Sequence, residues 1–185
     1  MFSKSAQWFY KIATGKTVIL LTIGFLLFVG ITMRLLPILI PASESMVSLD
    51  DPVFYTPAQV FSILDDWGET GRMQQLWFHM TWDVIVPLWS FLIVGSGSSW
   101  LLKRAFAPQS PWRKLNLVAW VTVFDLLENF SLAGLVLFYA RRPNWLAWLK
   151  NAFTMIKYGC GVLIVGICLT GAVLAARNKF MIQPD

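Results

Sequence analysis

Four long apolar stretches dominate this sequence of 185 residues. They cover residues 17–40, 76–102, 115–139 and 149–176. A helix needs about 20 residues to cross the roughly 30 Å hydrocarbon core of a bilayer, and each stretch is long enough. We therefore predict an all-α, polytopic membrane protein. Its four transmembrane helices are expected to form an antiparallel bundle within one integral membrane domain, residues 1–185.

The composition agrees with insertion into a membrane. Hydrophobic residues make up 57% of the chain and charged residues only 14%, whereas a soluble domain has about 25% charged residues. The formal net charge is +5, but the basic residues are divided among short loops. This division argues against a nucleic-acid surface. It favours contact with anionic lipids on the cytoplasmic side of the bilayer.

The positions of Lys and Arg predict the orientation, because cytoplasmic loops are enriched in these residues. The N-terminal tail, the second connection and the C-terminal tail are basic, while the first connection, residues 41–75, is acidic. Arg141 and Arg142 in the last short turn oppose this trend, but the other loops outweigh them. We expect both termini in the cytoplasm, the 41–75 loop outside, and the inner (cytoplasmic) membrane of a bacterium as the location.

One short helix is expected in the outer loop, over residues 57–67. Thr56 is a good N-cap and Pro57 suits the first helical position. The following residues place an apolar face on one side of this helix, formed by Val60, Phe61 and Leu64. Gly68 is expected to end it. The predicted helix is amphipathic and lies on the outer membrane surface or covers the mouth of the bundle.

Polar side chains interrupt the apolar stretches at Arg34, His79, Asp83, Asp125, Glu128, Asn129 and Lys157. A charge near the bilayer centre costs about 2.5–3.5 kcal/mol on insertion scales, so such groups normally face one another or a wet cavity. Helical spacing supports a common cluster, because residues three and four apart share a helix face. This spacing relates Gln75, His79 and Asp83 in one stretch, and the acids and asparagine in the next.

Charge balance suggests how these side chains pair. Lys157 is expected to meet Glu128 or Asp125, because a short turn makes the third and fourth helices antiparallel neighbours. Arg34 is expected to pair with Asp83. Pro87 removes the helical hydrogen bond to the carbonyl of Asp83, and we expect local unwinding there that widens a cavity.

Several interpretations of the cluster stay open. In the first, it binds a small amphiphilic or lipidic ligand in the outer leaflet through Arg34, Gln75, Asp125, Glu128, Asn129 and Lys157. If the protein is also an acid–base enzyme, His79 and Asp83 are the catalytic residues, because a carboxylate fixes the tautomer of a neighbouring imidazole. In the second, the cluster is an interhelical ion-pair network in an accessory subunit that contacts another membrane protein. The sequence neither shows nor excludes an enzyme.

A metal site is a further alternative, with His79, Asp83, Asp125 and Glu128 as ligands. It is not favoured, because a single histidine excludes bis-His haem and the common two-histidine metal motifs. We expect no cofactor.

His79, Asp83 and Asp125 also resemble the buried histidine and acids of the emopamil-binding sterol isomerases and their relatives. Those proteins bind lipophilic ligands within a small membrane bundle. The resemblance covers only a small part of the chain. It implies a lipophilic substrate class and isomerase-like chemistry.

Overall fold

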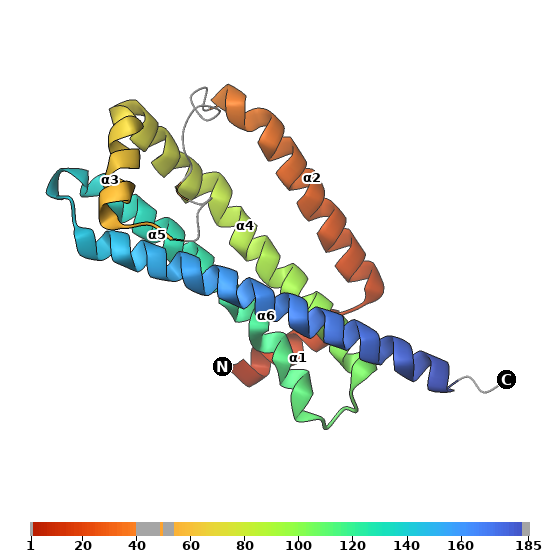
Figure 1. The fold of residues 1–185 in the computed structure, drawn as a ribbon. Coiled ribbons are helices and arrows are strands. Elements are labelled where there is room, and N and C mark those ends of the chain that lie inside the picture. Colours follow the sequence, from red (N-terminus) through yellow and green to blue (C-terminus); the bar gives the residue numbers. More distant parts are fainter. Residues whose placement is uncertain (1, 40–48, 50–53, 183–185) are drawn as a thin grey trace. The chain divides into compact units, whose positions relative to one another are not determined.

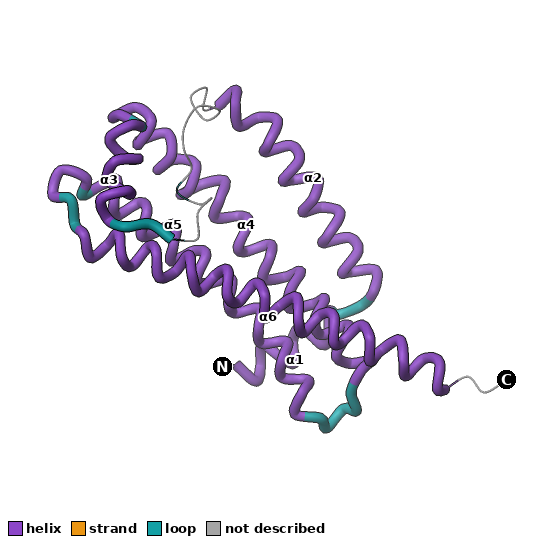
Figure 2. The backbone as a smooth tube through the Cα atoms, in the orientation of Figure 1, coloured by secondary structure: helices purple, strands orange, loops and turns teal. Residues whose placement is uncertain are grey.

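The chain is all-helical in its computed structural model, which describes residues 2–39, 49 and 54–182 (Figure 1). Short loops join most of the helices (Figure 2). The elements, in chain order, are α1 (Phe2–Ile12), α2 (Gly15–Leu39), α3 (Pro57–Asp66), α4 (Gly68–Ala105), η2 (Pro111–Thr122), α5 (Val123–Leu137), η3 (Tyr139–Arg141) and α6 (Asn144–Ile182).

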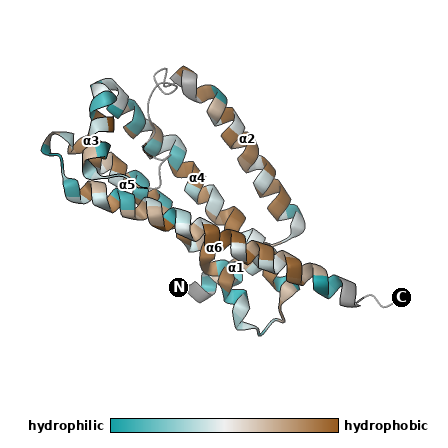
Figure 3. Ribbon diagram, viewed as in Figure 1, coloured by the Kyte–Doolittle hydropathy of each residue, from teal (hydrophilic) through white to brown (hydrophobic). Residues whose placement is uncertain are grey.

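Four helical segments of the described chain are long and apolar enough to cross a membrane: Gly15–Leu35, Gly68–Ala105, Pro111–Leu137 and Asn144–Lys179. Hydrophobic residues run along most of α2 and the middle of α6 (Figure 3). This finding confirms the predicted all-α membrane fold with four spanning helices. Gly15–Leu35 and Asn144–Lys179 have few residues buried inside the protein, and even in Pro111–Leu137, with the largest buried share of the four, most of the apolar window is not buried. This is expected for helices whose surfaces face lipid.

The chain divides into two compact units. Unit 1 comprises Met1–Phe25, Trp89–Val121 and Gly159–Asp185, and unit 2 comprises Leu26–Leu88 and Thr122–Tyr158. The helices α2, α4 and α6 each continue from one unit into the other.

In unit 1, α1 packs against α4 through a close contact at Gly95. The ring of Phe9 is completely buried and lies 5.0 Å from the ring of Phe91, centroid to centroid. A Cβ at Gly95 would lie 2.1 Å from the Phe9 ring, so only glycine permits this approach. The N-terminal segment therefore packs as a helix on the unit 1 half of α4.

The third spanning segment was predicted as one helix over residues 115–139, but its structure has two parts. It begins as the 3₁₀ helix η2 and continues as α5. The side chain of Asn116 in η2 donates to the carbonyl of Ala6 at 3.0 Å and to the hydroxyl of Ser99 at 2.8 Å. Both Asn116 and Ala119 are fully buried, and the three-residue repeat of a 3₁₀ helix places them on the same side.

The helix predicted over residues 57–67 is confirmed as α3. Thr56 and Gln59 form a capping box, in which Gln59 N donates to Thr56 Oγ1 at 3.3 Å and Thr56 N donates to Gln59 Oε1 at 2.8 Å. The chain then turns sharply into α4 at Gly68, whose φ of 62° is favourable only for glycine.

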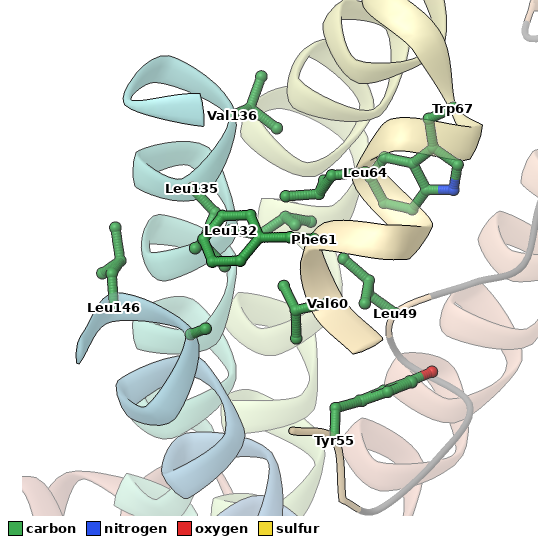
Figure 4. Close-up of a cluster of buried hydrophobic side chains, with 11 residues drawn as sticks. Leu49, Tyr55, Val60, Phe61, Leu64, Trp67, Leu132, Leu135, Val136 and Leu146 are labelled. Atoms are coloured by element: carbon green, nitrogen blue, oxygen red, sulfur yellow. The ribbon is translucent and has the colours of Figure 1, made fainter. Parts of the chain in front are cut away.

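The buried face of α3 joins the hydrophobic core of unit 2. Val60, Phe61 and Leu64 pack with residues of α5 and α6, as Figure 4 shows for Leu132, Leu135, Val136 and Leu146. This core holds α3 against the end of α5 and the start of α6.

Helix α4 begins earlier than expected and is not broken at its proline. The apolar stretch predicted a start at residue 76, whereas α4 starts at Gly68 and has 38 residues. Its polar first turns are held because Arg72 donates to the carbonyl of Leu64 at 2.9 Å and stacks over the ring of Tyr139. The helix also continues through Pro87, so the predicted unwinding at this position is wrong. The lost hydrogen bond to Asp83 alone does not open the helix.

Candidate functional site

The predicted polar residues of α5 contact a row of polar residues on α6, and those of α4 lie in the same unit, unit 2. Lys150, Thr154 and Lys157 are spaced four and three residues apart, which places them on one face of α6. Asp125 and Glu128 are three residues apart on α5. The two helices therefore present complementary charges to each other.

The inner part of this cluster is closed to solvent. Lys150 Nζ donates to Glu128 Oε1 at 2.9 Å, and both side chains are only 1% exposed. Thr154 Oγ1 donates to the same carboxylate oxygen at 2.6 Å. The other oxygen, Oε2, lies 2.5 Å from Lys157 Nζ. Glu128 thus interacts with two lysines and a hydroxyl, which offsets the large cost of burying its charge.

The same end of α6 also binds Leu49 and Tyr55, two described residues that precede α3. Lys150 donates to the backbone carbonyl of Leu49, and the backbone N–H of Tyr55 donates to Asn151 Oδ1 at 3.0 Å. Residues on both sides of residues 50–53 are therefore fixed to α6.

The outer part of the cluster is accessible. Lys157 Nζ donates to Asp125 Oδ1 at 3.1 Å, with these side chains 27% and 23% exposed. On α4, His79 Nδ1 lies 3.0 Å from Asp83 Oδ2, with His79 buried and Asp83 22% exposed. Asp83 lies within Coulombic range of Asp125. The two pairs therefore lie near each other in unit 2, one on α4 and one between α5 and α6.

Asn129, the next residue along α5 after Glu128, is buried with an unsatisfied donor. Its side chain is almost fully inaccessible, and its amide nitrogen has no hydrogen-bond partner among the described residues. Buried amides of this kind nearly always have a partner, so each exception needs an explanation.

The predicted pairing of Lys157 is confirmed, and in fact Lys157 contacts both Asp125 and Glu128. The predicted pairing of Arg34 with Asp83 is wrong. Arg34 is exposed on α2 and forms no ion pair within the described part of the chain, and Asp83 pairs instead with His79 one turn earlier on its own helix. Gln75 is half-buried and makes no hydrogen bond to a described residue.

Sequence reasoning missed Lys150, the most buried cation of the site. The fourth apolar stretch begins at residue 149, so Lys150 lies at its edge and is not among the polar residues that interrupt the stretch. Helix α6 instead begins at Asn144, which places Lys150 well inside the helix. Its spacing from Lys157 was a usable signal, because residues seven apart lie on the same helical face.

Metal binding finds no support at this site. Within the described ranges, no three His, Cys, Asp or Glu side chains are arranged to hold a metal ion. Glu128, one of the four ligands considered, is already bound by Lys150, Thr154 and Lys157.

The arrangement can accept hydrogen bonds at two partly exposed carboxylates, and it can transfer a proton at the His79–Asp83 pair. Nδ1 of His79 faces the carboxylate, so the neutral ring carries its proton on Nδ1. Both capacities lie well inside helices that can span a membrane. No protein-family model, curated protein or solved structure matches this chain.

Proposed function

We propose that this protein binds a small amphiphilic or lipidic ligand at the accessible part of the cluster, with Asp83, Asp125 and Lys157 as polar anchors. The observation that supports this function most is the partial exposure of all three side chains, 22%, 23% and 27%, within spanning segments. The buried Glu128–Lys150 pair forms the floor of this region.

The physical reason is the cost of exposing charge to hydrocarbon. An ionised side chain in a spanning helix is stable only beside another charge, water or a polar group. The Lys157–Asp125 pair neutralises part of the charge, but its outer surface still needs a polar neighbour. The polar end of an amphiphile, with its apolar part in the surrounding lipid, satisfies both requirements.

Charge balance suggests what the polar end carries. Glu128, Asp125 and Asp83 oppose Lys150 and Lys157, so the site holds one excess negative charge when His79 is neutral. A hydroxyl or ammonium group would donate to the accessible carboxylates.

The test compares amphiphiles that copurify with the wild type and with Asp83→Asn, identified by extraction and mass spectrometry. Asp83→Asn keeps the shape and removes the charge, so it should lose the bound amphiphile while the thermal midpoint stays nearly unchanged. Glu69→Gln is the matched control, because it removes an exposed acid from the same helix outside the cluster. It should retain the amphiphile.

Two outcomes would contradict the binding function. A marked fall in thermal midpoint for Asp83→Asn, with no amphiphile in the wild type, would favour a structural ion-pair network. A protein that copurifies in constant stoichiometry by native mass spectrometry would favour the accessory-subunit function.

An acid–base enzyme is the second candidate, supported by the 3.0 Å contact between His79 Nδ1 and Asp83 Oδ2. A histidine oriented by a carboxylate is a common general base. His79→Gln should then retain the copurifying amphiphile but abolish its conversion. Conversion is measured as a change in the chromatographic retention of the amphiphile. Loss of binding and conversion together would argue for a binding role of His79 alone.

The orientation stays a proposal based on the Lys and Arg distribution. We propose that both termini lie in the cytoplasm and that the protein resides in a bacterial inner membrane. The cluster of unit 2 then belongs to the outer leaflet.

A further inference from the structure

The charges of this chain are separated between its two units. Every acidic residue except Asp185 falls in the ranges of unit 2. Unit 1 contains most of the cations, namely Lys4, Lys11, Lys16, Lys103, Arg104, Arg113, Lys114, Arg177 and Lys179. A region with this imbalance attracts anions, including the headgroups of anionic lipids.

Unit 1 also contains a cavity of about 640 Å³ where α1 meets the start of η2. This volume lies within the range of small-molecule sites, roughly 300–1,000 Å³. Its polar lining comes from Gln7, Tyr10, Gln109, Ser110, Arg113 and Lys114, and it includes no carboxylate. The cavity therefore combines a positive charge with several hydrogen-bond donors.

Arg113 fixes the wall of this cavity and keeps its charge available. Its guanidinium donates to the carbonyl of Phe106 at 2.9 and 3.1 Å and to that of Lys103 at 3.1 Å. Tyr10 connects α1 to the same point, because its hydroxyl donates to the Arg113 carbonyl at 2.6 Å. Since all these acceptors are neutral, the positive charge of Arg113 is not cancelled.

Tyr10 adds no negative charge near neutral pH. Burial raises the pKa of its phenol to about 12, although the Arg113 charge acts in the opposite direction. The phenol therefore stays protonated and keeps its hydrogen bond to Arg113.

Three side chains of the lining have donors to offer. Lys114, Gln7 and Gln109 are exposed and make no hydrogen bond or ion pair within the described residues. They line the same cavity as Pro111, the first residue of the 12-residue helix η2, and the dipole at a helix N-terminus also favours an anion. The exposed indoles of Trp8 and Trp112 lie on the same two elements, as expected at the headgroup level of a membrane.

We propose that this cavity is a specific site for the phosphate headgroup of an anionic phospholipid, with Lys114 as its main charged contact and Gln7 and Gln109 as hydrogen-bond donors. The site is separate from the cluster in unit 2 and does not depend on its function. A lipid is favoured over a soluble phosphate compound because spanning helices and exposed tryptophans place the cavity beside a bilayer.

The experiment titrates short-chain phosphatidylglycerol into the delipidated full-length protein in neutral detergent, with bound lipid counted by native mass spectrometry. Phosphatidylcholine is the zwitterionic comparison. The wild type should bind one phosphatidylglycerol molecule in preference to phosphatidylcholine.

Lys114→Gln should weaken the binding of phosphatidylglycerol by about tenfold, because it removes a charge-assisted hydrogen bond. Lys16→Gln removes the same charge from an exposed position outside the cavity and should change binding by no more than about twofold.

A second pair of variants tests the cavity itself without changing charge. Gln7→Trp should fill the cavity and abolish the preference for phosphatidylglycerol, whereas Gln7→Ala should leave most of it. If Gln7→Trp lowers the thermal midpoint, the two lysine variants decide the question alone.

Three results would overturn the proposal. Equal losses for Lys114→Gln and Lys16→Gln would indicate diffuse attraction by the whole basic unit. Equal binding of phosphatidylcholine would remove the role of the anionic headgroup. Displacement of the lipid by millimolar inorganic phosphate would show that the site serves a small soluble phosphate compound instead.

Discussion

At the scale of single residues, the cluster depends on Glu128 more than on any other side chain. Its two carboxylate oxygens are contacted by Lys150, Thr154 and Lys157, and its side chain is closed to solvent. Removing one partner of a buried ion pair typically costs about 3–5 kcal/mol, since the remaining charge stays buried. The two lysines differ in exposure and should therefore differ in their effect on stability.

Lys150→Met should lower the free energy of unfolding by about 3–5 kcal/mol, and Lys157→Met by less, because Lys157 is partly exposed. Equilibrium unfolding in mixed detergent micelles measures both. Adding Glu128→Gln to Lys150→Met should recover part of the loss, because the buried charge is then removed. Simple addition of the two costs would show that the pair is not coupled.

Asp65 makes part of the stability dependent on pH. Hydrogen bonds from Tyr139 and then Arg142 hold the pKa of its carboxyl below the usual value of 3.8. The ionised form is thus favoured in the folded state, and this contribution is complete above about pH 4 and disappears as the pH falls through the lowered pKa.

Thermal midpoints at pH 7 and at progressively lower pH should therefore differ between the wild type and Asp65→Asn. The wild type should be more stable at neutral pH, and the two proteins should converge in acid. A difference that does not shrink as the pH falls below 4 would show that the carboxylate charge is not responsible. The pair is exposed, so the effect should also shrink at high salt.

At the scale of elements, α1 packs closely against α4 because Gly95 has no side chain. Gly95 permits the buried ring of Phe9 to approach. At Gly97, two residues later, an added Cβ would meet only the side chain of Val18, at 3.9 Å. Two glycines of the same helix thus have opposite packing environments.

Gly95→Ala should destabilise the protein by about 1–3 kcal/mol through overpacking, although alanine is the better helix former. Gly97→Ala, the matched control, should be neutral or stabilising by up to about 1 kcal/mol. Thermal unfolding measures both, and protease accessibility of residues 1–12 reports whether α1 is released. Equal effects of the two substitutions would contradict the packing described at Phe9.

Features with local causes could be predicted from the sequence. The helix α3 follows from Thr56 and Gln59, which cap it, and the pairing of Lys157 follows from the short connection between α5 and α6. Arg34 could not be placed in the same way, because α2 and α4 are far apart in the sequence, and no short connection predicts which of their residues face each other.

Other features depend on contacts that a pattern does not contain. The polar start of α4 is helical because Arg72 donates to the carbonyl of Leu64 and stacks over the ring of Tyr139. The 3₁₀ winding of η2 has no signature in its sequence. It accompanies the contacts of Asn116 with Ala6 and Ser99, which come from distant parts of the chain.

At the scale of the whole molecule, the separation of charge between the units bears on orientation. The basic ranges of unit 1 contain both termini and the connection between α4 and η2. Four spanning helices return the chain to the side on which it began. Under the proposed orientation, the positive-inside rule predicts that these three regions lie together in the cytoplasm.

A compartment reporter fused after Asp185 should accordingly read the cytoplasm, and one inserted at Asp51 should read the outside. Reporters active on opposite sides, such as a phosphatase and a fluorescent protein, give independent readings. A C-terminal reporter found outside would require an odd number of spans or an inverted orientation.

The ion pairs of unit 2 also have a consequence for biogenesis. Within the described residues, the partners of Asp125 and Glu128 lie on α6, which leaves the ribosome after α5. Until then, α5 carries two unneutralised acids that oppose its release into lipid. Helices α5 and α6 should therefore enter the bilayer together as a hairpin, and a nascent chain halted after Leu137 should remain beside the insertion machinery.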